Sequence, residues 1–467
     1  MAVSDWRLAR AVSLTGQLGV VSGTAIDVVL ARRLQLGDPE GHMRRALAEF
    51  PYPEMADKIL DRYFVAGGKS PDTPFVPNRV ISDTPTQEEQ ELVVVANFVE
   101  VFLAKDGHEG IVGINYLEKI QTPTLLSLFG AMLAGVDYVL MGAGIPRAIP
   151  GVLDRLANGD TVEMPLNVIG AGSDDRFVTR FDPRKFSGDR IPWLERPKFL
   201  AIVASSSLAS LLAKKSSGKV DGFVVEGPTA GGHNAPPRGK TDLNDRGEPI
   251  YGARDAVDLH AIAALGLPFW LAGSYGTPDG VARALDAGAT GVQVGTAFAF
   301  CNESGLRDDI KRCVLRMCCD DTVDVVTDPL ASPTGFPFKV LQLEGSLSED
   351  SVHEQRQRIC DLGFLRQAYR REDGTVGWRC PGEPRQTFLR KGGRIEETVG
   401  RKCVCNGLVA NVGLGQIRPC GQAEKPLVTC GNDVRNITRF LSARDSLSYS
   451  AADVVEHLLS GIELVAG

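Results

Sequence analysis

Short apolar runs recur along residues 11–300 and alternate with segments of helical periodicity. The runs are continuous rather than alternating with polar residues, which is typical of strands covered on both faces. Strands of this kind that alternate with helices predict a parallel sheet with crossover helices. The predicted strands are residues 19–22, 111–115, 138–141, 199–203, 222–225, 268–272 and 291–294.

Helix-start motifs lie between the predicted strands. Thr86, with Glu89 three residues later, predicts a capping box before a long apolar helix that ends near Leu103. Thr122 and Thr277 each precede a proline, which predicts N-caps with proline at the first helical position. Residues 34–85 and 171–197 interrupt the repeat, and we expect them to be insertions at one end of the scaffold.

The length of 467 residues is enough for one barrel and a smaller unit, since such barrels take about 250 residues or more. The pattern therefore predicts an α/β fold of the TIM-type (β/α)8 barrel class over residues 1–345. Residues 346–467 hold six of the ten cysteines, many glycines and a final helix that starts near Ser450. We expect them to form a C-terminal module.

Charge and hydropathy limit the partners of the chain. The formal net charge is -7 and the basic residues form no stripe, so nucleic acid is not expected as a partner. The most apolar window, residues 92–104, is too short to span a bilayer, and no membrane is expected. Asp5 and Arg7 stand where a secretion signal would be apolar, which favours a cytoplasmic protein with cysteine thiols. A small-molecule substrate is expected, and an oligomer is left open.

Three glycine-rich turns follow the late strands, at residues 225–233, 271–274 and 292–296. Loops after consecutive strands of a barrel lie side by side, and amides without a neighbouring Cβ can hold a phosphate there. The helix that begins near Thr277 would add its positive end. The alternative is that these glycines only form tight turns. Three such turns at consecutive strand ends favour the phosphate site.

The chain resembles the nitronate monooxygenase family over about residues 5–345. The motifs are Ala-Gly-Gly-His at 230–233, Gly-Ala-Thr-Gly-Val-Gln-Val-Gly-Thr at 288–296, and the helix and glycine turn at 8–19. That family binds FMN on a (β/α) barrel, and Asn115 matches an asparagine that faces the flavin. The cofactor-binding residues expected in this chain are Asn115, Glu226, Gly231, Gly232, Gly273, Ser274, Gln293, Val294, Gly295 and Thr296.

The same resemblance implies that His233 is catalytic. It would remove the α-proton of a nitroalkane or bind the nitronate, and an imidazole pKa near 7 suits proton abstraction at neutral pH. The alternative is a histidine that only forms a hydrogen bond within its loop or helps to hold phosphate. The implied enzyme is an FMN-dependent oxidoreductase that oxidises a small nitroalkane or nitronate with O2.

Three departures from the family affect this interpretation. The chain starts at the first helix without the family's first strand, so we expect either a longer natural protein or a replacement strand at residues 166–170. Glu226 stands where the family has glutamine, and an ionised carboxylate cannot donate to a flavin carbonyl. Glu226 is then protonated, turned away or paired with a base. Ser274 replaces a second glycine, and residues 234–238 are unusually stiff.

Two other functions stay open. Residues 196–200 and 332–339 are similar to the enoyl reductases of polyunsaturated fatty-acid and polyketide synthesis. That similarity implies NAD(P)H as a second cofactor, with hydride passing through FMN to an enoyl thioester. The other alternative is a flavin-free barrel that serves as a binding scaffold.

The module cysteines raise the question of a metal. Cys360, Cys380, Cys403 and Cys405 have the residue type of zinc ligands, but only Cys403-Val404-Cys405 forms a close pair. Zinc sites usually show two to four residues between paired cysteines. We therefore expect buried thiols that pack as small hydrophobic groups, and no metal, with a four-cysteine site as the alternative.

Overall fold

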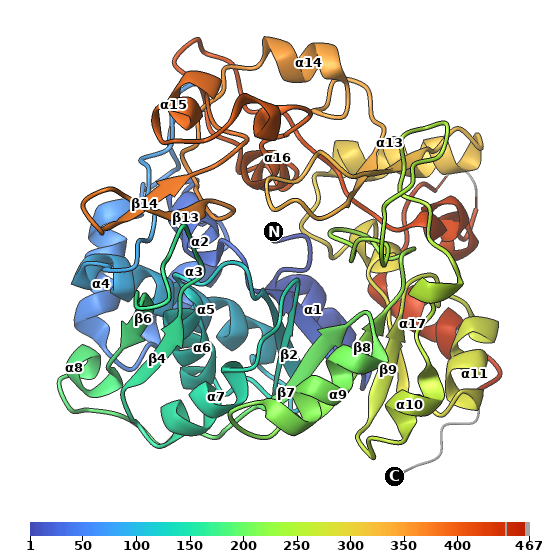
Figure 1. The fold of residues 1–467 in the computed structure, drawn as a ribbon, viewed down its shortest axis with the longest axis horizontal. Coiled ribbons are helices and arrows are strands. Elements are labelled where there is room, and N and C mark those ends of the chain that lie inside the picture. The colour runs from blue at the N-terminus through green and yellow to red at the C-terminus, as the bar shows by residue number, and fades with distance from the viewer. Residues whose placement is uncertain (444–445, 463–467) are drawn as a thin grey trace.

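The computed structural model describes residues 1–443 and 446–462 and contains a seven-stranded parallel sheet. Its order is β1-β2-β3-β7-β8-β9-β10, so these seven strands follow one another across the sheet in the same order as along the chain. The sheet curls, with helices outside it (Figure 1). The predicted barrel sheet is confirmed, and every strand end lies within two residues of its predicted position. The strands are β1 (Gly19–Ser22), β2 (Val112–Leu117), β3 (Tyr138–Gly142), β7 (Lys198–Val203), β8 (Gly222–Glu226), β9 (Phe269–Ala272) and β10 (Gly291–Gln293).

The two faces of the sheet pack in separate clusters, because successive side chains of a strand point to opposite faces. One face, with Val139, Phe199 and Phe223, joins the large core formed with the helices. The other face, with Leu140 and Leu200, forms a small apolar cluster of its own. The continuous apolar runs in the sequence therefore reflect burial on both faces.

The sheet is open between its edge strands, since β1 and β10 do not pair with each other in the described residues. A cavity of about 410 Å³ lies between these edges, and α17 (Ala451–Leu459) also lines it. This helix packs against α1 (Trp6–Ser13) and α11 (Pro278–Asp286). The replacement strand expected at residues 166–170 is wrong. That segment contains β5 (Val168–Ile169), which is partly exposed and pairs with a strand of the C-terminal module instead.

The helix starts follow the capping motifs in two of three cases. Thr86 and Glu89 form the predicted capping box of α5 (Gln87–Lys105). Thr277 accepts a hydrogen bond from the Gly280 amide at 2.9 Å and caps α11, as predicted. The predicted cap at Thr122 is wrong, because Pro123 already has helical backbone angles and is itself the N-cap of α6.

The insertions and the module complete the chain. No helix within residues 1–443 and 446–462 is both long and apolar enough to cross a membrane. The β13–β14 hairpin extends the small sheet of β5, and β4 pairs with β6. The remaining elements are α2 (Ile26–Gln35), α3 (His42–Ala48), α4 (Pro53–Tyr63), α6 (Thr124–Leu133), α7 (Ile149–Ala157), β4 (Val162–Pro165), β6 (Val178–Phe181), α8 (Pro183–Ser187), α9 (Ser206–Lys215), η1 (Ala253–Asp255), α10 (Leu259–Ala263), α12 (Thr296–Ala299), α13 (Asp308–Cys319), β11 (Val325–Asp328), β12 (Phe338–Leu341), α14 (Asp350–Gln355), β13 (Gln367–Arg370), β14 (Val376–Arg379), α15 (Arg385–Arg390), η2 (Ile395–Thr398), α16 (Val404–Ala410) and η3 (Asn432–Phe440).

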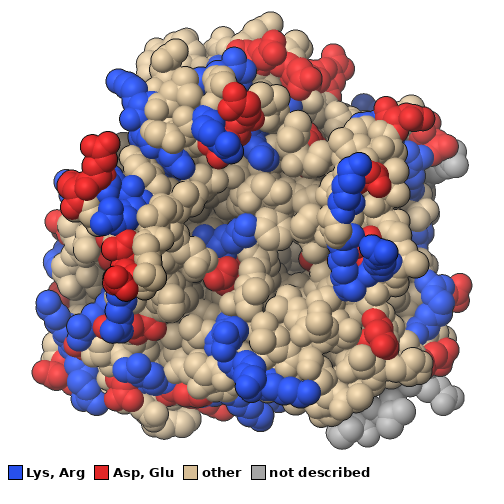
Figure 2. Space-filling view, in the orientation of Figure 1, with Lys and Arg blue, Asp and Glu red and all other residues tan. Residues whose placement is uncertain are grey.

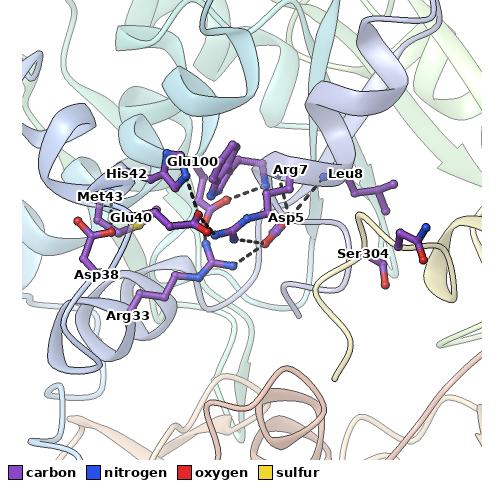
Figure 3. A network of polar contacts seen from close by, with 12 residues as sticks. Asp5, Arg7, Leu8, Arg33, Asp38, Glu40, His42, Met43, Glu100 and Ser304 are labelled. Carbon is purple, nitrogen blue, oxygen red and sulfur yellow. Dashed lines mark hydrogen bonds and ion pairs between the residues drawn. The ribbon is translucent and has the colours of Figure 1, made fainter. Parts of the chain in front are cut away.

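A buried ion network holds the start of α1 against α2 and α5 (Figure 3). Arg33 Nη2 lies 2.7 Å from Asp5 Oδ2, and its Nη1 lies 2.6 Å from Glu100 Oε1. Asp5 also caps α1 by accepting from the Arg7 amide, and Glu100 accepts from the Trp6 amide at 3.0 Å. One guanidinium thus neutralises two buried carboxylates that fix the first helix.

Candidate active site

The carboxyl ends of the strands face a hollow between the barrel and the C-terminal module (Figures 1 and 2). Figure 2 shows basic and acidic side chains on its walls. At this end of the sheet, Asn115, Gln293, Val294 and Gly295 all line the cavity of about 410 Å³. The structure thus brings together Asn115 of β2, Gln293 at the end of β10, and Val294 and Gly295 just after it.

The corners after β8 and β9 touch each other. A methyl group added at Gly273 would lie 3.0 Å from Thr229 Oγ1 and 3.3 Å from the Ala230 amide nitrogen. Gly273 has a φ of 99°, and the next residue, Ser274, has a φ of 61°. A glycine adopts such angles without strain, whereas serine rarely does. The serine at this position therefore keeps the backbone shape of the family's second glycine.

A segment near the C-terminus joins the corners after β8 and β10. The Gly431 amide donates to Thr296 Oγ1 at 2.8 Å, and a methyl group at Gly231 would lie 2.9 Å from Gly431 N. The Gly232 amide donates to Thr429 Oγ1 at 2.9 Å. We call residues 429–433 the return segment. Sequence reasoning missed it, although the Gly431-Asn432-Asp433 run is typical of a turn that starts a helix.

A polar hollow of about 150 Å³ lies where the return segment meets the start of α11. Its lining is Ser274, Gly276, Thr277, Asn432, Asp433, Asn436 and Arg439. The amides of Ser274 and Gly276 donate to no described residue. Arg439 Nη1 donates to the Gly276 carbonyl at 3.0 Å. The hollow therefore offers one cation, free amides and a helix N-terminus to an anion.

Asp433 is the acidic group of this hollow. Burial raises its pKa, while a hydrogen bond from the Thr296 hydroxyl opposes that rise. The raised pKa weakens its opposition to an anion. The same contact occupies the hydroxyl group of Thr296, which is one of the expected cofactor-binding residues.

Glu226 ends β8 opposite Ala272 of β9. Burial raises the pKa of its carboxyl group to about 7. The carboxyl group forms no ion pair with any described residue. Of the three states expected from the sequence, protonation is the one that this environment favours, and a neutral carboxyl group can donate a hydrogen bond.

His233 contacts Ser332, in the segment before β12, and Phe338, the first residue of β12. Its Nε2 is 2.7 Å from Ser332 Oγ, and its ring centroid is 4.8 Å from that of Phe338. Burial, with a smaller contribution from the charge of Lys119, lowers the pKa of His233 to about 4. The imidazole is therefore neutral at pH 7 and less basic than the sequence suggested. Lys119 itself, just after β2, was not among the predicted site residues.

A model of the nitronate monooxygenase family matches residues 184–333. That span begins before β7 and ends after β10, and it includes the corners at Gly231, Gly273 and Gly295. Over this segment the chain is similar to the nitronate monooxygenase family. The segment holds His233 and every predicted cofactor-binding residue except Asn115, so the family's motifs sit where the strand ends meet.

Curated relatives match parts of the chain. It is 31% identical over 231 residues to the (3aS,4S,5R,7aS)-5-hydroxy-7a-methyl-1-oxo-octahydro-1H-indene-4-carboxyl-CoA dehydrogenase of Mycobacterium tuberculosis, which covers 46% of this chain and 60% of that protein. It is 28% identical to a probable nitronate monooxygenase of Staphylococcus haemolyticus over 36% of this chain and 47% of that protein. The chain thus matches between about half and three fifths of these relatives.

Solved structures with a similar backbone include FabK from Thermotoga maritima, with a TM-score of 0.46 and 14% identity over 98% of this chain and 88% of that one. A nitroalkane oxidase from Streptomyces ansochromogenes has a TM-score of 0.42 and 15% identity over 98% and 92%. Both scores are below 0.5, so the fold described above rests on the strand pairing of this chain.

The cysteines lie outside the nitronate monooxygenase segment except for Cys301, Cys313, Cys318 and Cys319, and all ten are free thiols. A hydrogen bond between Cys360 and Cys380 lowers the pKa of the first thiol and raises that of the second. Cys403 and Cys405 are buried. In the part of the chain that the structure describes, no three His, Cys, Asp or Glu side chains are placed to hold a metal ion. The four-cysteine metal site finds no support in this arrangement.

Proposed function

We propose that the chain is an FMN-dependent oxidoreductase that oxidises a small nitroalkane or nitronate with O2. The observation that carries the proposal is the position of the nitronate monooxygenase segment, which supplies Glu226, His233 and three glycine corners at one end of the sheet. Bound FMN supplies a ring that takes two electrons from the substrate and returns them to O2.

The polar hollow fits the phosphate of FMN. Free amides of Ser274 and Gly276, the N-terminus of α11 and the guanidinium of Arg439 all favour a dianion. Asp433 opposes it least when protonated, and burial raises the pKa of that carboxyl group. These residues come from the corner after β9 and from the C-terminal module, so the return segment would belong to the cofactor site.

The residues near the strand ends fit the ring of FMN. Asn115 and Gln293 line the cavity of about 410 Å³, and their amides can donate to or accept from the ring's polar edge. Glu226, neutral up to about pH 7, can donate a hydrogen bond as the family's glutamine would. Below about pH 7 the carboxyl group thus replaces the amide without a change of donor function.

The environment of His233 favours the nitronate as the substrate form. A base with a pKa of about 4 is poorly matched to removing a carbon-bound proton at pH 7. A nitronate has already lost that proton, and a neutral imidazole held by Ser332 can position it by a hydrogen bond. His233 would then bind and orient the substrate rather than deprotonate it.

Purified protein tests the proposal directly. It should be yellow, release FMN, and lose its flavin colour under anaerobic conditions on mixing with propyl-2-nitronate, with recovery in air. Rapid bleaching by NAD(P)H and none by nitronate would favour the enoyl reductase instead. A protein that stays colourless after incubation with FMN would contradict any flavin enzyme and favour the binding scaffold.

His233→Asn separates the two histidine roles. The variant should weaken nitronate turnover far more than FMN binding, with Ser332→Ala as a milder change to the same contact. If His233 acted as a base, the loss would be confined to neutral nitroalkanes, and nitronate turnover would remain at the wild-type rate.

A further inference from the structure

A second cavity lies at the seam between the barrel and the C-terminal module and has a volume of about 240 Å³. Lys119 and Gln121 line it from the loop after β2, and Arg366 and Trp378 line it from the module. The volume equals that of roughly eight water molecules, which is room for a small organic molecule. The insertion that carries β5 closes it at Asn167 and Ile169.

Both cations of this seam pocket lack an acidic partner. Within residues 1–443 and 446–462, no carboxylate lies within 4.0 Å of Lys119 or Arg366 as an ion pair, and the lining contains no Asp or Glu. The nearby acid Glu118 is bound to Gln121 at 3.1 Å, and Glu383 is paired with Lys391 at 2.7 Å. Two partly buried positive charges therefore face the cavity without a direct ion-pair partner, and Glu118 and Glu383 act on them only from beyond ion-pair distance.

The two cations are held in place by neutral groups. Arg366 donates to the carbonyls of Gly363 and Ile81, both at 3.0 Å, and its guanidinium lies 4.9 Å from the Trp378 ring centroid. Lys119 Nζ lies 3.8 Å from the ring centroid of Phe336. Aromatic rings and carbonyl groups fix a cation without cancelling its charge. The charges stay available to a ligand.

The rest of the lining suits an apolar body. Ile120, Leu166, Phe364, Leu365 and Trp378 supply apolar surface, while the amides of Asn167 and Gln367 add polar contacts at the edge. This combination of an apolar wall with a few convergent polar groups is typical of a ligand site. The pocket also adjoins the candidate active site, since Thr334 of its lining lies 2.8 Å (Oγ1 to Oγ) from Ser332, the hydrogen-bond partner of His233.

We infer that the seam pocket binds a small organic anion with an apolar body, and that Lys119 and Arg366 select its charge. A nitronate belongs to this class, so the inference rests on the proposed function for the identity of the physiological anion. The charge preference itself needs no flavin. Because Arg366 and Trp378 line the seam pocket, the C-terminal module is part of the substrate site in this inference.

Calorimetric titration of the full chain with benzoate and with its neutral analogue benzamide tests the inference. We expect benzoate to bind at least tenfold more tightly at low ionic strength. Lys119→Gln and Arg366→Gln should each weaken benzoate binding by about tenfold, as the loss of one charge-assisted contact implies, and leave benzamide unchanged. Lys240→Gln, which removes the same charge from an exposed side chain, should change neither.

Two further measurements keep the test decisive. Quenching of tryptophan emission by 4-nitrobenzoate should disappear in Trp378→Phe, which places the anion in the seam pocket. Arg366→Lys keeps the charge if Arg366→Gln fails to fold, and it should retain most of the preference. Equal binding of benzoate and benzamide, or an unchanged preference in both charge variants, would overturn the inference.

The outcome is separable from that of the proposed function. A colourless protein that still prefers benzoate keeps the seam pocket and loses the flavin enzyme. A yellow protein that oxidises nitronate without any preference for the anion keeps the enzyme and loses the seam pocket.

Discussion

Glu226→Gln should remove a pH dependence from both stability and FMN binding. Burial raises the pKa of Glu226 to about 7 from an ordinary value of 4.5. At about 1.4 kcal/mol per pKa unit, ionising this carboxyl group costs the folded state at most about 3.5 kcal/mol. The site is partly open to solvent, so the measured cost should be smaller.

The sign of the effect follows from proton binding. Between about pH 4.5 and 7 the folded protein keeps the proton of Glu226 and the unfolded chain does not, so stability falls as pH rises and then levels off. Glutamine carries no such proton. Relative to the wild type, Glu226→Gln should therefore gain up to about 3.5 kcal/mol at pH 8 and almost nothing near pH 4.5.

Urea denaturation of flavin-free protein at pH 5 and pH 8 measures the stability difference. Fluorescence titration with FMN from pH 6 to 9 measures the binding. Wild-type affinity should fall as pH rises above 7, because the ionised carboxylate can no longer donate, while the variant should lack this component. Asp433→Asn is the control, since its affinity for FMN should still fall as pH rises above 7. Parallel pH profiles for wild type and Glu226→Gln would refute the assignment.

Three other changes test the architecture. Arg33→Met leaves Asp5 and Glu100 buried without their cation and should cost about 3–5 kcal/mol of unfolding free energy in urea denaturation. The side chain of Arg7 is 44% exposed, and Arg7→Met should cost under about 1 kcal/mol. Equal losses in the two variants would contradict the buried network. Gly273→Ala should weaken FMN binding by tenfold or more because its methyl group meets Thr229, while Gly288→Ala, at a similar φ in open space, should leave affinity unchanged. Thr296→Val removes the acceptor for the Gly431 amide and should cost about 1–3 kcal/mol in thermal unfolding, with Thr296→Ser restoring most of it; an unaffected Thr296→Val would show that the return segment is held elsewhere.

The strands were predictable because a buried strand is marked by a continuous run of apolar residues within its own sequence. A strand between two layers of helices or side chains must be apolar at every position, and residues 199–203 and 222–225 show this without any knowledge of their neighbours. The capping boxes are local in the same way, since Thr86 and Glu89 are three residues apart. The cap at Thr122 failed because the backbone of the following proline was already helical.

Contacts between distant segments were not predictable. The return segment touches Thr229 and Thr296 across more than a hundred residues, and no periodicity links them. The pairing of β5 with β13 is equally remote. The low pKa of His233 depends on burial beneath Ser332 and Phe338, which no motif encodes. Motifs in the sequence identify the residue types of the site, whereas long-range packing determines the charge states of Glu226 and His233.

The contact between α1 and α17 has a consequence for synthesis on the ribosome. Residues 6–13 emerge from the ribosome long before residues 451–459, the helix that packs on them. At about 5–20 residues per second, roughly 20 to 90 seconds separate the two. Throughout that interval, the side of α1 that carries Leu8 and Val12 lacks its contact with α17, which makes nascent chains of this protein candidates for chaperone binding until α17 has emerged.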